Sequence, residues 1–103
     1  MKVMMTGFAR RQIRKTAKYI NNEFGKRSKD KFLLEVQLTK RLLEANPYLG
    51  PKEPLLADRP TTYYSIVISH LNKMVYRIME DYIEVADFWD TRREPQRQAE
   101  QVK

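Results

Sequence analysis

Residues 63–95 read YYSIVISHLNKMVYRIMEDYIEVADFWDTRREP, and this stretch determines which kind of sheet to expect. Three runs rich in Val, Ile, Tyr and Phe follow one another, separated by polar breaks of two to four residues. Side chains of these types suit a pleated, half-buried surface, and breaks of this length are typical of hairpins. We therefore predict an antiparallel meander, with strands at about 63–68, 73–79 and 82–89.

The first 45 residues predict a short strand and two helices. Apolar residues recur at spacings of three and four along residues 9–24, which is the pattern of one buried helical stripe. The second helix has two neighbouring apolar lines, so we expect it to pack against both the first helix and a sheet. These lines are Phe32, Val36 and Leu43, and Leu34, Leu38 and Leu42. The predicted elements are a strand at 2–5, a helix from an N-cap at Thr6 to Phe24 that Gly25 closes, and a helix from an N-cap at Ser28 to Ala45.

The order of these elements predicts one α+β domain over residues 1–95. An N-terminal helical hairpin should pack on a twisted antiparallel sheet of three to four strands. Residues 46–61 contain four of the five prolines, and we interpret them as an ordered loop that crosses from the helices to the sheet. Residues 96–103 are polar and lack periodicity, so we expect a flexible C-terminal tail.

The amino-acid composition of the chain limits the classes of function that it could have. The chain has 103 residues and a net charge of +7, which favours polyanions or an acidic protein partner, although a well-solvated surface has the same signature. It contains no cysteine, which excludes disulfides and thiolate metal sites. The N-terminus lacks the order of a signal peptide, and no segment has the roughly 20 apolar residues of a membrane helix. We expect a soluble, cytoplasmic protein that does not associate with membranes.

Motifs of small-molecule enzymes are absent from the sequence. A single histidine, His70, without cysteines cannot build a zinc site, and the acidic residues of the last strand lack the spacing of a hydrolase metal centre. The three glycines are too far apart for a phosphate-binding loop, and no G-x-S-x-G motif occurs. We therefore expect neither a metal nor an organic cofactor.

Two groups of cations are candidates for binding. The first lies on the polar sides of the first helix, where it could neutralise phosphates, dock an acidic partner or simply be solvated. It consists of Arg10, Arg11, Arg14, Lys15 and Lys18. The second lies in and after the last strands, where cations alternate with tyrosines in a pattern suited to RNA or to stabilising a phosphoryl transition state. It consists of Lys73, Arg77, Arg92 and Arg93, with Tyr63, Tyr64, Tyr76 and Tyr82. The alternative is that these tyrosines are cross-strand packing residues.

The order of elements, ending in W-D-x-R-x-x-P at residues 89–95, resembles the RelE/ParE superfamily of type II toxin–antitoxin toxins, also called the plasmid stabilisation family. The resemblance spans Val3 to Pro95. Its pieces are Ala9, Ile13 and Tyr19-Ile20; Asn46-Pro47 with Gly50; Tyr63; residues 73–78; Ile83-x-Val85; and Phe88 to Arg92 with Pro95.

The resemblance implies a toxin that a co-encoded antitoxin neutralises through helix-in-groove and strand-addition contacts, with oligomers formed through the antitoxin. Some members cleave mRNA on the ribosome without a metal, and others poison DNA gyrase. Lys73 and Arg92 match basic positions of the family, and with Arg77 and Tyr82 (or Tyr76) they are the expected catalytic residues. Arg93 and the cations of the first helix would bind nucleic acid or a partner. Tyr64 stands where ribonuclease members often have Arg, so a nucleic-acid-binding module without catalysis, or an inactive homologue, remains an alternative.

Overall fold

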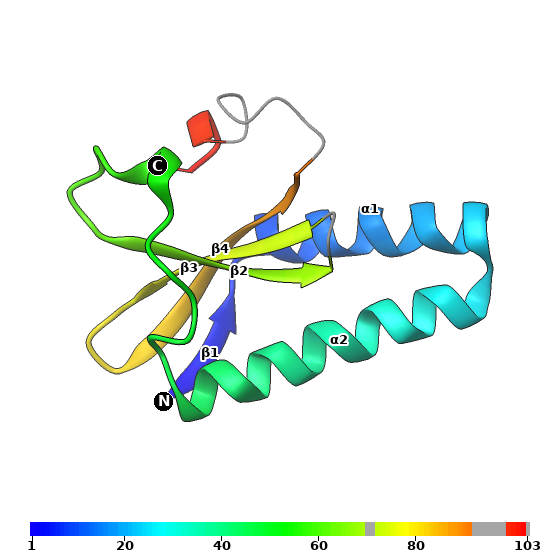
Figure 1. Cartoon of the computed structure of the whole chain (residues 1–103), viewed down its shortest axis with the longest axis horizontal. Helices are drawn as coiled ribbons and strands as arrows, with labels where there is room; N and C mark the ends of the chain where they lie inside the picture. The colour runs from blue at the N-terminus through cyan, green and yellow to red at the C-terminus, as the bar shows by residue number, and fades with distance from the viewer. Residues whose placement is uncertain (70–71, 92–98, 103) are drawn as a thin grey trace.

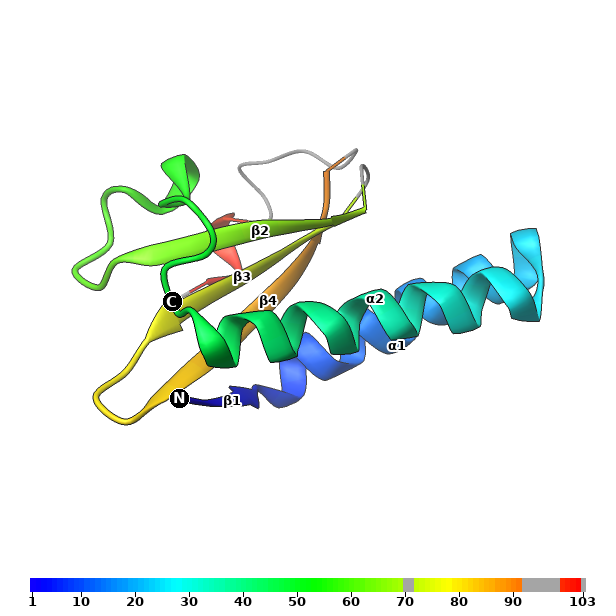
Figure 2. The same cartoon turned by 60° about the horizontal axis from the view of Figure 1, so that its bottom comes forward.

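The computed structural model describes residues 1–69, 72–91 and 99–102. Two helices form a long hairpin that lies on one face of a four-stranded sheet (Figures 1 and 2). The elements are β1 Lys2–Met5, α1 Gly7–Phe24, α2 Lys26–Ala45, the short 3-10 helix η1 Pro54–Leu56, β2 Tyr63–Ser69, β3 Asn72–Ile78 and β4 Tyr82–Asp90. The predicted α+β architecture, including the three-stranded meander, is confirmed.

The sheet has the strand order β1-β4-β3-β2. The strands β2, β3 and β4 pair in antiparallel fashion, whereas β1 lies parallel to β4 with Lys2 beside Tyr82. The sheet is therefore mixed and not, as the sequence predicted, antiparallel throughout. The position of β1 depends on contacts made far along the chain. Thr6, which follows β1, donates its N–H to the carbonyl of Val85 at 3.0 Å and its hydroxyl to that of Ala86 at 3.2 Å.

The connection between the two helices is shorter than the sequence predicted. The Thr6 hydroxyl accepts a hydrogen bond from the N–H of Ala9 at 3.0 Å, so the predicted N-cap is confirmed. Gly25 has φ 94°, a conformation that favours glycine, and it separates the two helices alone. The predicted cap at Ser28 is wrong, because α2 begins at Lys26 and the Ser28 hydroxyl donates to the Phe24 carbonyl of the preceding turn.

The main core lies between the helices and the sheet. It contains the predicted lines Ala9, Ile13 and Ala17 of α1 and Phe32, Val36 and Leu43 of α2, together with Met74, Tyr76, Ile83, Val85 and Phe88 of the sheet. The second predicted line of α2 is not part of it, because its leucines face away from both α1 and the sheet. Phe24, at the tip of the hairpin, is also exposed.

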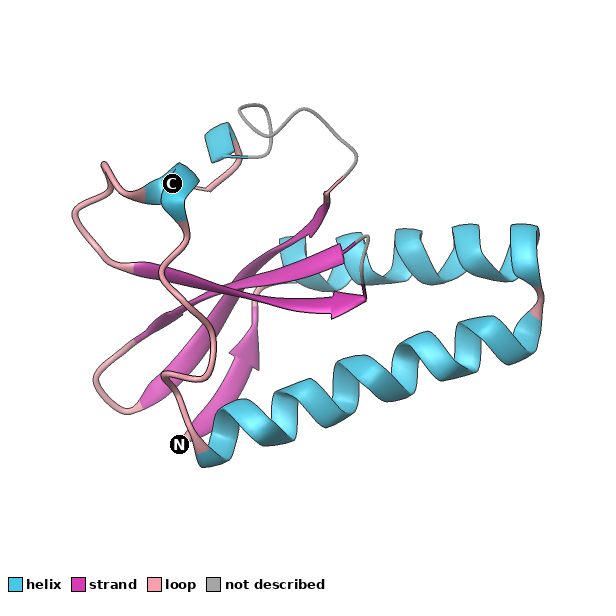
Figure 3. Cartoon of the chain, in the orientation of Figure 1, coloured by secondary structure: helices cyan, strands magenta, loops and turns pink. Residues whose placement is uncertain are grey.

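The other face of the sheet, which we call the outer face, has its own smaller core. The segment between α2 and β2 crosses this face (Figure 3), and the cluster there consists of Leu56, Tyr63, Val75, Trp89, Ala99 and Val102. Arg59 donates hydrogen bonds to the carbonyls of Ala99 at 2.9 Å and Val102 at 3.3 Å. Residues 99–102 of the expected flexible tail are therefore packed in the structure, and residues 96–98 and 103 lie outside the described residues.

Candidate functional site

Two of the predicted catalytic cations lie together on the outer face of the sheet. Lys73 and Arg77 are separated by Val75 on β3, so strand alternation points both side chains to the same side. On β4 they pair with Trp89 and Glu84, respectively. The Nζ atom of Lys73 lies 5.2 Å from the centre of the Trp89 ring, within the range of a cation–π contact.

Arg77 is held by an acidic neighbour and two aromatic ones. Its Nε atom donates to Glu84 Oε1 at 2.9 Å, and its guanidinium lies 5.8 Å from the centre of the Tyr63 ring. The hydrogen bond to Glu84 is the main reason why the pKa of Arg77 lies above its ordinary value, and Tyr63 and Tyr82 add to this effect. Tyr82 lies two residues before Glu84 on β4, so strand alternation points it to the same outer face as Arg77.

Lys73 also forms an ion pair with Glu53, a residue of the crossing loop that the sequence did not identify as functional. Glu53 is only 2% exposed, and its Oε1 atom accepts hydrogen bonds from Lys73 Nζ and, at 2.9 Å, from Ser65 Oγ. Its Oε2 atom accepts the N–H of Leu55 at 3.0 Å. Burial by itself would raise the pKa of Glu53, but the three hydrogen bonds, led by that of Lys73, bring the pKa below its ordinary value. Glu53 is therefore an ionised carboxylate beneath an ammonium group.

A second buried carboxylate, Asp87, supports the tryptophan on which Lys73 rests. Its Oδ2 atom accepts the indole N–H of Trp89 at 2.7 Å, and its Oδ1 atom accepts the N–H of Phe88 at 2.7 Å. Asp87 is 1% exposed, and this burial raises its pKa even though both hydrogen bonds favour the ionised form. The pKa values of Glu53 and Asp87 are thus shifted in opposite directions.

The fluorescence of Trp89, the only tryptophan, should report the titration of Asp87. Protonation changes the acceptor of the indole hydrogen bond, so emission is expected to change with a midpoint above 3.8, the ordinary pKa of an aspartate. Asp87 binds its proton more tightly in the folded state than in the unfolded state. Its protonation therefore raises the free energy of unfolding as the pH falls through the folded pKa toward 3.8. In an Asp87→Asn variant the emission change should disappear. A midpoint at or below 3.8, or a transition that persists in the variant, would contradict this assignment.

The other tyrosines lie on the helix side of the sheet, away from Lys73. Tyr76 is buried, and its hydroxyl accepts the N–H of Gly50 at 3.0 Å and donates to the carbonyl of Pro47 at 2.9 Å. Tyr64 stacks on Tyr76 with ring centres 5.6 Å apart, and Tyr48 meets Tyr64 edge-on at 5.8 Å. Both hydrogen-bonding functions of Tyr76 are therefore used to hold the crossing loop, whereas Tyr63 and Tyr82 are the tyrosines on the side of the outer-face cations.

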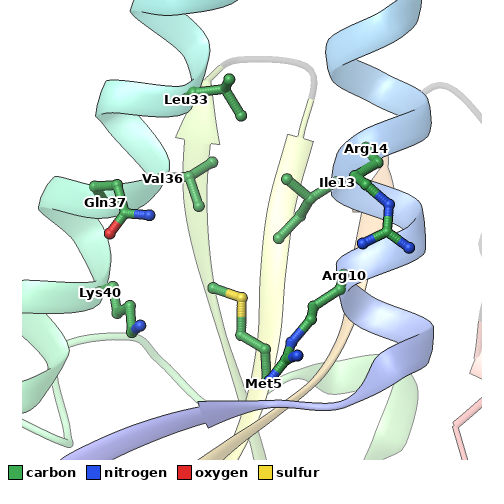
Figure 4. A pocket seen from close by; sticks show the side chains of 8 residues that line it. All are labelled: Met5, Arg10, Ile13, Arg14, Leu33, Val36, Gln37 and Lys40. Carbon is green, nitrogen blue, oxygen red and sulfur yellow. The ribbon is translucent and has the colours of Figure 1, made fainter.

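The basic face of α1 is divided in two. Arg10 and Arg14 border an open hollow of about 190 Å³ between α1 and α2, together with Lys40 (Figure 4). Its remaining lining residues are Met5, Ile13, Leu33, Val36 and Gln37. By helical spacing, Arg11, Lys15 and Lys18 form a separate exposed line, in which Arg11 lies 5.9 Å from the centre of the Phe8 ring. The cations of α1 lie on the opposite side of the sheet from Lys73 and Arg77, so the two predicted groups do not form one site.

Several sequence predictions fall elsewhere or have no structural counterpart. Arg92, Arg93 and His70 lie outside the described residues. Within residues 1–69, 72–91 and 99–102, no three His, Asp or Glu side chains gather as a metal site would require. In the same part of the chain, neither helix has a stretch long and apolar enough to span a bilayer.

Comparison with solved structures shows the fold. A chain of the chromosomal ParDE TA system from P. aeruginosa superimposes with a TM-score of 0.72 and 12% sequence identity, over 87% of this chain and 95% of that one. The chain has a RelE/ParE-like fold. The YoeB dimer structure from Staphylococcus aureus matches with a TM-score of 0.57 and 20% identity, over 84% of this chain and 92% of that one. The YoeB/ParE toxin from Agrobacterium tumefaciens matches with a TM-score of 0.59 and 20% identity, over 87% and 98%.

The comparison that shows the RelE/ParE-like fold is the structural one. No protein-family model matches the chain, and no curated protein matches it. At 12–20% identity, what this chain shares with these structures is the fold.

Proposed function

We propose that this chain is the toxin component of a type II toxin–antitoxin module, which inhibits growth by acting on translation or on DNA gyrase and is neutralised by a cognate antitoxin. The observation that carries the proposal is the match over 87% of the chain, with a TM-score of 0.72, to a chain of a ParDE TA system. Two further matches are to YoeB-type chains. The exposed cations of α1 provide charge of the sign that both nucleic acids and an acidic antitoxin attract.

Of the two targets, the charge balance of the outer face favours DNA gyrase. A group that stabilises a phosphoryl transition state must offer positive charge to the developing anion. Lys73 is paired with Glu53 and Arg77 with Glu84, so each of these two cations already has a carboxylate beside it. Tyr64, at the position where the resemblance implies an Arg in ribonuclease members, lies on the helix side of the sheet against Tyr76 and adds no charge to the outer face.

Endonuclease activity is the second candidate, because one feature of the same face favours it. An ionised carboxylate beside an ammonium group is an arrangement used in general acid–base catalysis. Glu53, Lys73 and Ser65 form such a group. Glu53 is 2% exposed, however, so a substrate hydroxyl would reach it only if Lys73 moved aside.

Induction of the chain alone in bacteria should arrest growth, and this experiment tests the proposal. We expect pulse-labelling within minutes of induction to show DNA synthesis falling before protein synthesis. Under gyrase poisoning, Lys73→Ala and Arg77→Ala should retain their toxicity to the extent that they fold. Under endonuclease action, protein synthesis should fall first, and either substitution should lower toxicity by about 100-fold or more, as is typical for loss of a group that stabilises a transition state.

Two controls make the result interpretable. Circular dichroism of each purified variant separates loss of folding from loss of function, and Arg11→Ala changes a cation on the opposite side of the sheet. If neither synthesis falls although the protein accumulates in folded form, the toxin proposal is wrong. The chain would then be a nucleic-acid-binding module or an inactive relative with the same fold.

A further inference from the structure

The outer side of α2 carries an apolar ridge that no part of the described chain covers. Leu34, Leu38 and Leu42 are 58%, 48% and 56% exposed, although they recur every four residues on a well-formed helix. The ridge is about 12 Å long, since an α-helix rises about 1.5 Å per residue. Single exposed leucines are common, but three in one row form the kind of ridge that packs into the groove of another helix.

This ridge is distinct from both the core and the hollow between the helices. Phe32, Val36 and Leu43 point from α2 into the core, so the ridge lies on the opposite side of the helix. The residues of α2 that line the hollow are Leu33, Val36, Gln37 and Lys40, which belong to the side that faces α1. Figure 2 shows α2 running along the outside of the molecule.

Positively charged side chains lie on both sides of the ridge. A turn of 100° per residue places Arg27, Lys31 and Arg41 on the same side of α2 as the leucines, and all three are exposed. None of the three forms an ion pair among the described residues, whereas the nearby Asp30 pairs with Lys26 at 2.9 Å. The carboxylates at the margin of the ridge are the half-buried Glu35 and this same Asp30, which lies one turn before Leu34 in the row of leucines.

This charge pattern argues against a second copy of the chain as the occupant. If two copies packed their ridges antiparallel, Arg27 and Lys31 of one copy would meet Arg41 of the other. In a parallel arrangement, identical cations would lie side by side. Both arrangements bring like charges together between molecules that each carry +7, which costs free energy at the contact.

We propose that the outer side of α2 docks an acidic amphipathic helix of a partner protein. The partner's apolar stripe packs on Leu34, Leu38 and Leu42, and its carboxylates meet Arg27, Lys31 and Arg41. The identification of this partner as the antitoxin rests on the function proposed above, whereas its chemistry rests on α2 alone.

A designed peptide tests this interface with the full chain. The probe is a fluorescein-labelled helical peptide of about 21 residues, six turns of helix, with leucines along one face and glutamates beside them. One control peptide has the same composition in scrambled order, and another has lysine for every glutamate. Fluorescence anisotropy should show that the acidic amphipathic peptide binds with a Kd in the micromolar range, while both controls bind at least about tenfold more weakly. Chemical-shift mapping on ¹⁵N-labelled chain should place the contact on α2.

Variants of the chain identify the residues that bind. Leu34→Gln combined with Leu38→Gln should weaken binding at least about tenfold, and glutamine preserves helix propensity, so the fold should be retained. Arg27→Gln, Lys31→Gln and Arg41→Gln together should weaken binding and remove most of its dependence on salt. The matched control is Val67→Gln, which alters an apolar residue of β2 that is 61% exposed and should leave binding unchanged.

Several outcomes would overturn the inference. These are no measurable binding of the acidic peptide, equal binding of the scrambled peptide, or unchanged affinity in the leucine variant. Sedimentation of the chain alone adds another: a dimer that the leucine variant dissociates would make a second copy the occupant. The peptide titration does not depend on growth. If the chain arrests growth but does not bind the acidic peptide, only this inference is refuted. A chain that binds the peptide but is harmless refutes only the proposed function.

Discussion

Replacing Lys73 with methionine is expected to lower the free energy of unfolding by about 3 kcal/mol at neutral pH. The substitution preserves the aliphatic contact with Trp89 but removes the ammonium group that neutralises Glu53. Glu53 would then be a carboxylate that is 2% exposed and is held only by Ser65 and the N–H of Leu55. Leaving one partner of a buried ion pair without its counter-charge is among the most destabilising single changes.

The pH dependence of this loss follows from the pKa of Glu53. The pKa is lower in the folded chain than its ordinary value of 4.5, so the ion pair adds stability above that value and loses it as the pH falls through the folded pKa. The difference between wild type and Lys73→Met should therefore be largest near neutral pH and should shrink below about pH 4.5. Urea unfolding of both proteins, followed by circular dichroism at several pH values, measures this difference in the free energy of unfolding.

A double variant provides the control. Glu53→Gln in the Lys73→Met background removes the buried charge, so it should recover part of the lost stability, because two contacting residues do not contribute additively. The free energy of unfolding of Lys73→Met could instead lie within about 0.5 kcal/mol of the wild-type value at neutral pH, which is the effect of an ordinary surface substitution. In that case the ion pair does not stabilise this loop.

Gly50→Ala is expected to destabilise the fold by about 3 kcal/mol, the upper end of the cost of overpacking a rigid site. A Cβ atom at this position would lie 2.4 Å from the backbone oxygen of Ser65 and 3.1 Å from the Tyr76 hydroxyl. The backbone of β2 cannot yield as a flexible side chain can, so the crossing loop would shift. Its hydrogen bond from the Gly50 N–H to Tyr76 would be lost with it.

Thermal unfolding measures this effect against a matched glycine. For a domain of this size, a loss of about 3 kcal/mol corresponds to a Tm lowered by roughly 12–24 °C. Gly7→Ala should leave the Tm unchanged or slightly raised, because its Cβ would meet only the end of the Arg11 side chain at 3.4 Å and alanine favours helix. A Gly50→Ala variant that melts like the wild type would show that the loop is not held against Ser65.

Elements with strong local signals could be predicted from the sequence. The cap at Thr6, the break at Gly25 and the three strands of the meander each depend on residues close together in the chain. The error at Ser28 has a local cause, since glycine with positive φ allows the second helix to begin at once. The shared face of Lys73 and Arg77 is also a local property, because side chains four residues apart on a strand point to the same side.

The candidate site could be predicted only in part, because the groups that tune it come from distant segments. Glu53 lies twenty residues before Lys73, in a loop whose path no periodicity describes. Asp87 has no sequence signature of a buried carboxylate, since its burial requires the outer face to be covered. For the line of leucines on α2 the sequence predicted burial, whereas the structure shows exposure. Its pattern is identical to that of a buried stripe, and a pattern cannot show which of two apolar lines meets the sheet.

The helices, the strands, the charge of +7 and the cations of β3 follow from composition or from residues near one another in the chain. The parallel pairing of β1 with β4, the neutralisation of Lys73 by Glu53 and the outward position of Leu34, Leu38 and Leu42 follow from contacts between distant segments. The physical reason is that burial and ion pairing depend on which surfaces meet in space. That choice is made by the packing of the whole chain, in which many distant contacts contribute at once.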